Sequence, residues 1–278
     1  MGKLKTSAEV KNLKLKSILG DHLRELAARE GIDPKGRVGE LVKKLLKVDE
    51  GRIDEFIKER YADLAGERRK QISDKELKAE LDKVTDFSWG MVQGGLDQRI
   101  QREYVRQHYR YDDLLQAVKG NLQGEVESYV VCSWYNHWTT VLIEDHISEH
   151  ENVIPTLKKV KGIDLFFRGQ PFDLKTTMLP KGFELARAKA DLSELAVWLY
   201  ENQGEERFGD DPRFFVVLAD SKNPDESWKL KRDVTFVFKQ IDNFLGSEDV
   251  SEADQIVFEY GDETFVTLAK VLLVVREQ

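Results

Sequence analysis

Residues 162–177 read GIDLFFRGQPFDLKTT and predict a β-hairpin. Two apolar runs, 163–167 and 172–177, flank a segment whose Gly and Pro are typical of a turn. Because side chains alternate between the faces of a strand, Asp173 and Lys175 share one face. If the two runs pair across the turn, Asp164 of the first run lies close to both.

This grouping of two carboxylates and a lysine predicts metal-dependent chemistry. Asp164 and Asp173 would repel each other unless a cation lies between them. Mg²⁺ suits such a position, because it takes oxygen ligands and keeps water molecules that can be activated. We therefore expect Mg²⁺ as the cofactor, with Lys175 beside it.

At these residues the chain resembles the PD-(D/E)xK nuclease superfamily. Asp164 stands at the position of the first acid, and Asp173-Leu174-Lys175 forms the (D/E)xK element, while Ile163 replaces the proline of the family name. The resemblance implies that Asp164 and Asp173 bind the metal and that Lys175 orients or polarises the attacking water. The Leu174 carbonyl would complete the metal shell. The alternative interpretation is an exposed hairpin with a surface ion pair.

A helix upstream of the hairpin is expected to supply a third acid, because nucleases of this superfamily begin their core in this way. Glu127 heads a series of apolar side chains at the spacing of one helix face, namely Val130, Val131, Trp134, Trp138, Val141 and Leu142. We expect Glu127 to bind the metal, with Glu125 as the alternative. Both would otherwise be first-turn glutamates that stabilise the helix dipole without a metal.

The sequence after the hairpin predicts a helix over 183–202, a buried strand over 214–219 and a final strand over 265–275. The order of helix, hairpin, helix and strand matches the core that the resemblance implies. We therefore expect a mixed α/β (α+β) fold, with a restriction-endonuclease-like central mixed sheet flanked by helices. This nuclease domain is expected to span residues 86–278.

The amino-terminal part, residues 1–85, predicts a helical domain. Two short amphipathic helices flank a Gly/Pro turn, and 36–41 (GRVGEL) resembles the second helix of a SAP-type DNA-binding module with one residue fewer. Residues 1–49 hold 12 Lys and Arg against 7 Asp and Glu, in a chain of net charge -8. We expect a SAP-like DNA-binding region followed by connecting helices. A helical pair that merely packs on the rest is the alternative.

Basic and hydroxyl side chains in three segments are expected to contact the DNA backbone, since they neutralise phosphates or donate to them. They are Lys35, Arg37, Lys43, Thr176, Thr177, Lys181, Lys229, Lys231 and Arg232. The first three belong to the amino-terminal region, and Thr176, Thr177 and Lys181 follow the hairpin directly. The last three follow the strand predicted over 214–219.

Length and composition fit this reading. A chain of 278 residues with 41% hydrophobic content suits one large domain with an appendage, or two domains. The sequence has no apolar run of membrane-spanning length, and its Lys-rich start lacks the apolar stretch of a signal peptide. We therefore expect a cytoplasmic protein.

Together these features predict a Mg²⁺-dependent, sequence-specific double-stranded DNA endonuclease of the type II restriction class. A palindromic target cut on both strands calls for a homodimer, and host protection calls for a companion DNA methyltransferase. Two alternatives remain open. One is a structure-selective or repair nuclease with the same site, and the other is a non-catalytic DNA-binding protein.

Overall fold

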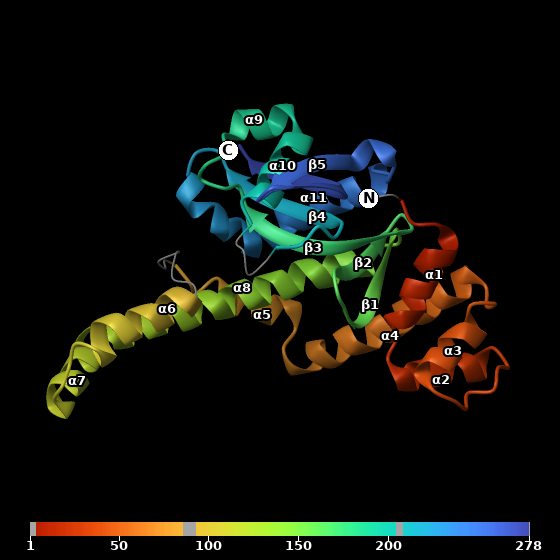
Figure 1. The fold of residues 1–278 in the computed structure, drawn as a ribbon, viewed down its shortest axis with the longest axis horizontal. Coiled ribbons are helices and arrows are strands. Elements are labelled where there is room, and N and C mark those ends of the chain that lie inside the picture. Colours follow the sequence, from red (N-terminus) through yellow and green to blue (C-terminus); the bar gives the residue numbers. More distant parts are fainter. Residues whose placement is uncertain (1–3, 86–92, 204–207, 278) are drawn as a thin grey trace. The chain divides into compact units, whose positions relative to one another are not determined.

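The computed structural model of the protein describes residues 4–85, 93–203 and 208–277 (Figure 1). Contacts divide the chain into two compact units: unit 1 comprises Met1–Gln71 and Ile143–Gln278, and unit 2 comprises Ile72–Leu142. This grouping differs from the division expected at residue 85, because the amino-terminal helices share a unit with the sheet. Each unit is described by itself.

The centre of unit 1 is one six-stranded sheet in the order β1-β2-β3-β4-β6-β5. Its strands are β1 (Val153–Val160), β2 (Ile163–Phe167), β3 (Gln170–Met178), β4 (Arg213–Asp220), β5 (Gln255–Tyr260) and β6 (Glu263–Arg276). β3, β4 and β6 run parallel to one another, whereas β1–β2, β2–β3 and β5–β6 are antiparallel pairs. The predicted mixed α/β fold is confirmed.

Helices surround this sheet and form all the regular structure of unit 2 that is described (Figure 1). Unit 1 contains α1 (Ser7–Lys16), α2 (Gly20–Arg29), α3 (Val38–Leu45), α4 (Glu50–Gln71), α9 (Leu185–Ala190), α10 (Leu192–Glu201), η4 (Pro224–Arg232), α11 (Val234–Ser247) and η5 (Glu252–Asp254). Unit 2 contains α5 (Asp74–Leu81), α6 (Gln93–Arg99), η1 (Ile100–Val105), α7 (Tyr111–Ala117) and η2 (Val118–Leu122). The long helix α8 (Gln123–Glu149) begins in unit 2 and ends in unit 1.

The apolar strand β4 shows how the layers form. All eight of its residues are buried, as expected for a central strand of a parallel sheet covered on both faces. Phe214, Val216 and Leu218 pack with the end of α8 and with α11. Phe215 and Val217 pack on the opposite face with α9 and α10. The predicted helix over 183–202 is two helices, because Asp191 ends α9 and caps α10 by accepting from the Ser193 N–H at 2.8 Å.

The amino-terminal helices pack against the edge strand β1. Leu157 of β1 belongs to the same apolar core as α1–α4, and its N–H donates to the Ser17 carbonyl at 3.1 Å. The buried Lys14 joins α1 to α4 through Glu50 and Asp54, each at 2.7 Å. The helices therefore cover an edge that would otherwise be open to further strand pairing. None of the helices in the described part of the chain combines the length and apolar character that a membrane crossing requires.

The hairpin predicted over 162–177 is confirmed. Its register pairs Leu165 with Phe172 and Phe167 with Gln170, which leaves Arg168 and Gly169 as a two-residue turn. Both turn residues have positive φ, 48° and 75°, as the tightest hairpin turns require. Gly169 adopts this conformation without steric cost, whereas Arg168 does not.

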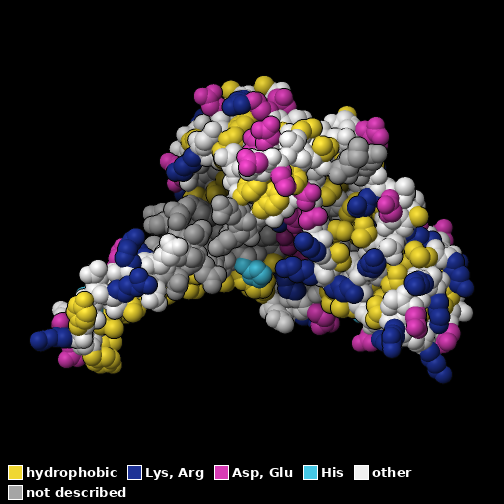
Figure 2. Space-filling model, viewed as in Figure 1, with side chains coloured by type: hydrophobic (Ala, Val, Ile, Leu, Met, Phe, Trp, Pro, Cys, Tyr) yellow, Lys and Arg dark blue, Asp and Glu magenta, His cyan; other side chains and the backbone are white. Residues whose placement is uncertain are grey.

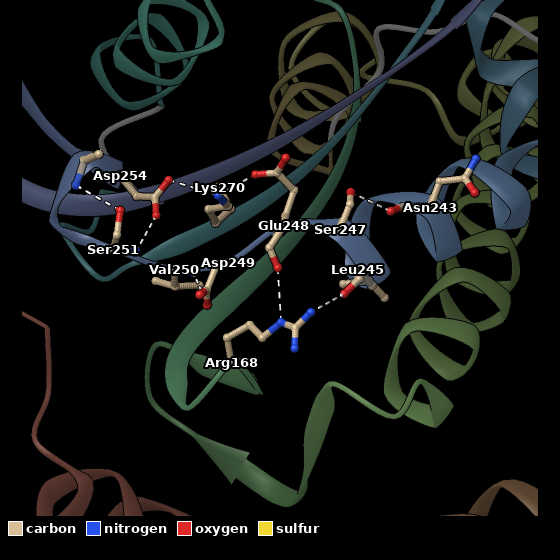
Figure 3. A network of polar contacts seen from close by, with 11 residues as sticks. Arg168, Asn243, Leu245, Ser247, Glu248, Asp249, Val250, Ser251, Asp254 and Lys270 are labelled. Carbon is tan, nitrogen blue, oxygen red and sulfur yellow. Dashed lines mark hydrogen bonds and ion pairs between the residues drawn. The ribbon is translucent and has the colours of Figure 1, made fainter.

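The Arg168 guanidinium compensates for this backbone strain by capping α11 (Figure 3). It donates to the carbonyls of Leu245, Gly246 and Glu248 at 3.4, 3.2 and 3.1 Å. These carbonyls end the helix, where a cation is favoured by the helix dipole. The turn that closes the hairpin is thus tied to the helix beneath the sheet.

Two substitutions at Arg168 separate the effect of backbone strain on the free energy of unfolding from the effect of capping α11. Arg168→Ala keeps the strained φ and loses the cap, so we expect it to lower the free energy of unfolding by about 2 kcal/mol. Arg168→Gly also loses the cap but relieves the strain, so its loss should be smaller by about 1 kcal/mol. Urea unfolding of both variants measures the difference. An alanine variant as stable as the glycine variant would contradict this account.

Candidate active site

The strand β3 changes its partner at Asp173. Its earlier residues pair with β2, whereas Asp173 pairs with Arg213 of β4 and donates its N–H to the Pro212 carbonyl at 2.8 Å. Strand alternation then turns the backbone of Leu174 toward β2. There the Leu174 N–H donates to Asp164 Oδ2 at 2.9 Å. The carboxylate of Asp164 therefore takes the place of a ladder carbonyl where the β2–β3 pairing ends.

Asp164 and Asp173 lie side by side at this end of the ladder. Loss of hydration raises the pKa of Asp164, the neighbouring Asp173 carboxyl raises it further, and the Leu174 N–H opposes both. A raised pKa means that the ionised pair is unfavourable by itself. The two carboxylates therefore favour the binding of a proton or a cation. The expectation that the hairpin brings them together is confirmed.

Two cations contact the carboxylate of Asp173. Lys175 Nζ lies 2.8 Å from Asp173 Oδ1, and Arg213 Nε lies 3.6 Å from Asp173 Oδ2. Arg213 is buried, donates to Gln203 Oε1 at 2.7 Å, and lies 4.7 Å from the centre of the Tyr200 ring. Its position is fixed by packing, while Lys175 is exposed. We did not predict Arg213 from the sequence, although an arginine directly before a wholly apolar strand is an unusual signal.

Glu144, on the part of α8 within unit 1, is a third acid that we did not predict. Burial raises the pKa of Glu144 to about 7, the charges of Asp164, Asp145 and Asp173 add to this, and Lys175 opposes it. Its carboxyl therefore belongs to the same electrostatic environment as the two aspartates. Two acids, Glu144 and Asp145, directly follow the apolar residues 141–143, but the sequence does not show which of them faces the hairpin.

The helix face on which the prediction of Glu127 rested is wrong. Glu127 is exposed, and so are Val130 and Trp134 of the expected buried face. Leu142 of the predicted face is buried, but the other buried residues of this helix are Tyr135, Thr139, Ile143, Asp145, Ile147 and Ser148. The side that buries α8 is therefore about one residue, or roughly 100°, from the side we predicted.

Glu125, the alternative to Glu127, has a partner of its own. Its Oε1 pairs with Arg99 at 2.8 Å within unit 2. Glu125 and Glu127 both belong to unit 2, whereas Glu144 lies in the same unit as Asp164 and Asp173. A metal role for Glu125 or Glu127 stays a prediction, and Glu144 is the stronger candidate.

The three basic residues predicted to bind DNA in the amino-terminal region are exposed. Lys35 lies in the turn between α2 and α3, Arg37 precedes α3, and Lys43 lies on α3. Lys44 holds this turn by donating to the carbonyls of Asp33 and Lys35 at 3.2 and 3.1 Å. Figure 2 shows Lys and Arg side chains distributed over these helices.

The residues that follow the hairpin lie in different environments. Thr176 and Thr177 are consecutive in β3, so their side chains point to opposite faces of the sheet and only one can face the aspartates. Thr177 is the one on the side of Asp173 and Lys175. Lys181 is almost fully exposed and pairs with Asp225 at 2.8 Å.

The basic cluster of η4 is less accessible than expected. Lys231 is buried, so its predicted role in contacting a DNA phosphate is not supported. Lys229 and Arg232 lie over the Trp228 ring, 5.5 and 5.4 Å from its centre, and both remain partly exposed. The burial of one of three neighbouring cations follows from the packing of η4 on β4, which the sequence does not reveal.

Comparisons of this chain with family models, curated proteins and solved structures found no match. The fold and the site geometry are therefore the observations on which any function must rest.

The donor set fits Mg²⁺ better than a transition metal. Across residues 4–85, 93–203 and 208–277, no group of three His, Cys, Asp or Glu side chains is gathered closely enough to hold a metal ion by itself. Mg²⁺ does not need such a cage, because it usually binds one or two carboxylates and keeps its waters. Asp164 and Asp173 supply two adjacent carboxylates, and the Leu174 backbone faces the same gap.

The melting temperature of a Glu144 variant at two pH values tests whether the pKa of Glu144 is raised. Its pKa in the folded protein, about 7, exceeds the ordinary value of 4.5, so ionising it costs stability as pH rises from about 4.5 through 7. Glu144→Gln removes that cost. We therefore expect its melting temperature without metal to match wild type near pH 5 and to exceed it by a few degrees at pH 8, where Glu144 is ionised.

Mg²⁺ at pH 8 should narrow this difference, because a cation at the aspartates also relieves the repulsion. Glu151→Gln, at an exposed position, serves as the matched control and should show no pH-dependent gain. A gain for Glu144→Gln of equal size at pH 5 and pH 8 would show that the pKa of Glu144 is not raised in the folded protein.

Proposed function

We propose that this protein is a cytoplasmic, Mg²⁺-dependent endonuclease that hydrolyses phosphodiester bonds of double-stranded DNA at specific sequences, in the manner of type II restriction enzymes. One observation carries the proposal. The hairpin brings Asp164 beside Asp173 where the β2–β3 ladder ends, with Lys175 Nζ 2.8 Å from Asp173. Paired carboxylates beside a mobile cation are what hydrolysis of a phosphodiester requires.

Each residue has a distinct role under this proposal. Asp164 and Asp173 would hold Mg²⁺ through their carboxylates, and the Leu174 carbonyl would add a backbone ligand. When bound, the ion supplies an activated water and neutralises charge on the phosphate. Lys175, which is exposed, would donate to a water or to a phosphate oxygen at this site. Arg213 keeps Asp173 in place from the protein interior.

The proposal includes three partners. Double-stranded DNA is the substrate, and the exposed Lys35, Arg37 and Lys43 would contact its phosphates. A second copy of the chain would be needed to cut both strands of a palindromic site. A DNA methyltransferase would protect the host's own copies of that site.

Cleavage of supercoiled plasmid DNA tests the proposal. We expect the purified protein to produce discrete linear fragments with Mg²⁺ and none with EDTA. Asp173→Asn and Lys175→Met should each lower the cleavage rate by at least about a hundredfold, because each removes a group that acts on the reacting phosphate. Sequencing of the fragment ends then gives the site and the cut position.

Two exposed residues of the same types provide matched controls. Asp262→Asn lies in the β5–β6 turn and Lys161→Met in the β1–β2 turn, and both should cleave at the wild-type rate. Wild-type protein that leaves every DNA intact with Mg²⁺ would refute the nuclease proposal. Fragments with random ends would refute sequence specificity alone.

A further inference from the structure

Two tyrosines of unit 2 are exposed where η1 ends and α7 begins. Residues 106–111 read RQHYRY, and Figure 1 shows α7 at one end of unit 2. The Tyr109 side chain is 97% exposed and that of Tyr111 is 73% exposed. Tyr104, five residues before Tyr109, is only 6% exposed. We refer to residues 106–111 as the tyrosine loop.

Packing within unit 2 does not explain why Tyr109 and Tyr111 are exposed. Its apolar core is built from Leu96, Tyr104 and Leu122, with partly buried neighbours on η1, α7, η2 and α8. Tyr109 and Tyr111 are not part of that core. A large aromatic ring in water loses the free energy that its burial would provide, so two exposed rings in one loop indicate a surface that binds a partner.

The charge of the tyrosine loop itself favours an anionic partner. Residues 99–111 contain four Arg and one Glu, and that Glu103 already accepts from Arg99 at 2.8 Å and from Arg102 at 2.6 Å. The tyrosine loop itself has no acid, and its Arg106 and Arg110 are exposed. Asp112 and Asp113 follow in the first turn of α7, where they complement the helix dipole.

Arginines alternating with exposed aromatic rings match the chemistry of unpaired nucleotides. An aromatic side chain stacks on the face of a nucleobase, and Arg neutralises the adjacent phosphate. The base faces are covered by neighbouring base pairs in an intact duplex, so ring stacking of this kind requires unpaired bases.

We propose that the tyrosine loop binds unpaired bases of DNA, with Tyr109 and Tyr111 as stacking platforms and Arg106 and Arg110 as phosphate contacts. The inference rests on the proposed function for the choice of DNA as the polymer. It adds a class of DNA to that function, namely DNA that contains single-stranded or locally opened segments.

Binding measured without metal separates this inference from catalysis. Fluorescence anisotropy in EDTA compares the full chain on a single-stranded oligonucleotide, on a duplex with an unpaired bulge and on an intact duplex. We expect Tyr109→Ala/Tyr111→Ala to weaken binding to both unpaired DNAs by roughly tenfold or more, because each lost ring removes one stacked base. Affinity for the intact duplex should change by less than about twofold.

Two further double variants separate the contribution of the aromatic rings to DNA binding from that of the arginine charges. Tyr109→Phe/Tyr111→Phe keeps both rings and should bind unpaired DNA within about twofold of wild type. Arg106→Gln/Arg110→Gln should weaken binding and lower the slope of log affinity against log salt by about 1.4, since two phosphate contacts are lost. Because these side chains lie outside the core, circular dichroism should show wild-type folding for all three variants.

Several outcomes would overturn the inference. One is a Tyr109→Ala/Tyr111→Ala variant that binds unpaired DNA as tightly as wild type. Another is an equal loss of affinity for all three DNAs in that variant. The third is tighter binding of the wild-type protein to RNA than to DNA of the same sequence. Failure of plasmid cleavage with retained, ring-dependent binding of unpaired DNA would refute the nuclease proposal and leave the tyrosine loop as assigned.

Discussion

The exchange of partners by β3 is the constraint on which the candidate site depends. A strand that paired with β2 along its whole length would use the Leu174 N–H for a ladder hydrogen bond, and Asp164 would have no backbone donor to accept from. Instead β3 turns to β4 at Asp173, and the Leu174 N–H binds the Asp164 carboxylate at 2.9 Å. The change of pairing partner along β3 therefore places the carboxylates of Asp164 and Asp173 next to each other.

The change of pairing partner at Asp173 is stabilised on both sides, at the hairpin turn and at the start of the β3–β4 pairing. The hairpin turn is fixed to the end of α11 by the Arg168 guanidinium. The parallel pairing with β4 begins at Arg213, whose side chain is held by Gln203 and the Tyr200 ring. The backbone therefore holds the two aspartates near each other. Burial raises the pKa of Asp164, and the neighbouring Asp173 carboxyl raises it further.

The sequence predicted the hairpin and the strands β4 and β6 because they depend on local patterns, whereas the edge strands β1 and β5 were not predicted. The alternation along 162–177 and the Gly in its turn predict the two strands, but the turn is two residues and not the four predicted over 168–171. The apolar runs of β4 and β6 predict buried strands. Helix α8 was harder, because its aromatic and aliphatic residues surround the helix on more than one side. Trp134 and Trp138 suggested one face, whereas the structure buries Tyr135 and Thr139 on the adjacent one.

Glu144 and Arg213 were missed for a related reason. Each reaches the aspartates through contacts between segments far apart in the sequence, one through the packing of α8 and the other through β3–β4 pairing. No local pattern encodes such contacts. The burial of Lys231 is of the same kind, because three neighbouring cations in η4 look alike until the helix packs on β4.

The two cations at Asp173 suit different tasks because they differ in mobility. Arg213 is 9% exposed and held on several sides, and a guanidinium does not lose its proton, so it contacts Asp173 as a fixed cation from the protein interior. Lys175 is 47% exposed on a flexible stem, so breaking its ion pair with Asp173 costs little. If Mg²⁺ takes over the Asp173 carboxylate, Lys175 is the cation released to meet water or phosphate. The exposed ion pair with Asp173 therefore leaves Lys175 free to turn to the substrate under the proposed function.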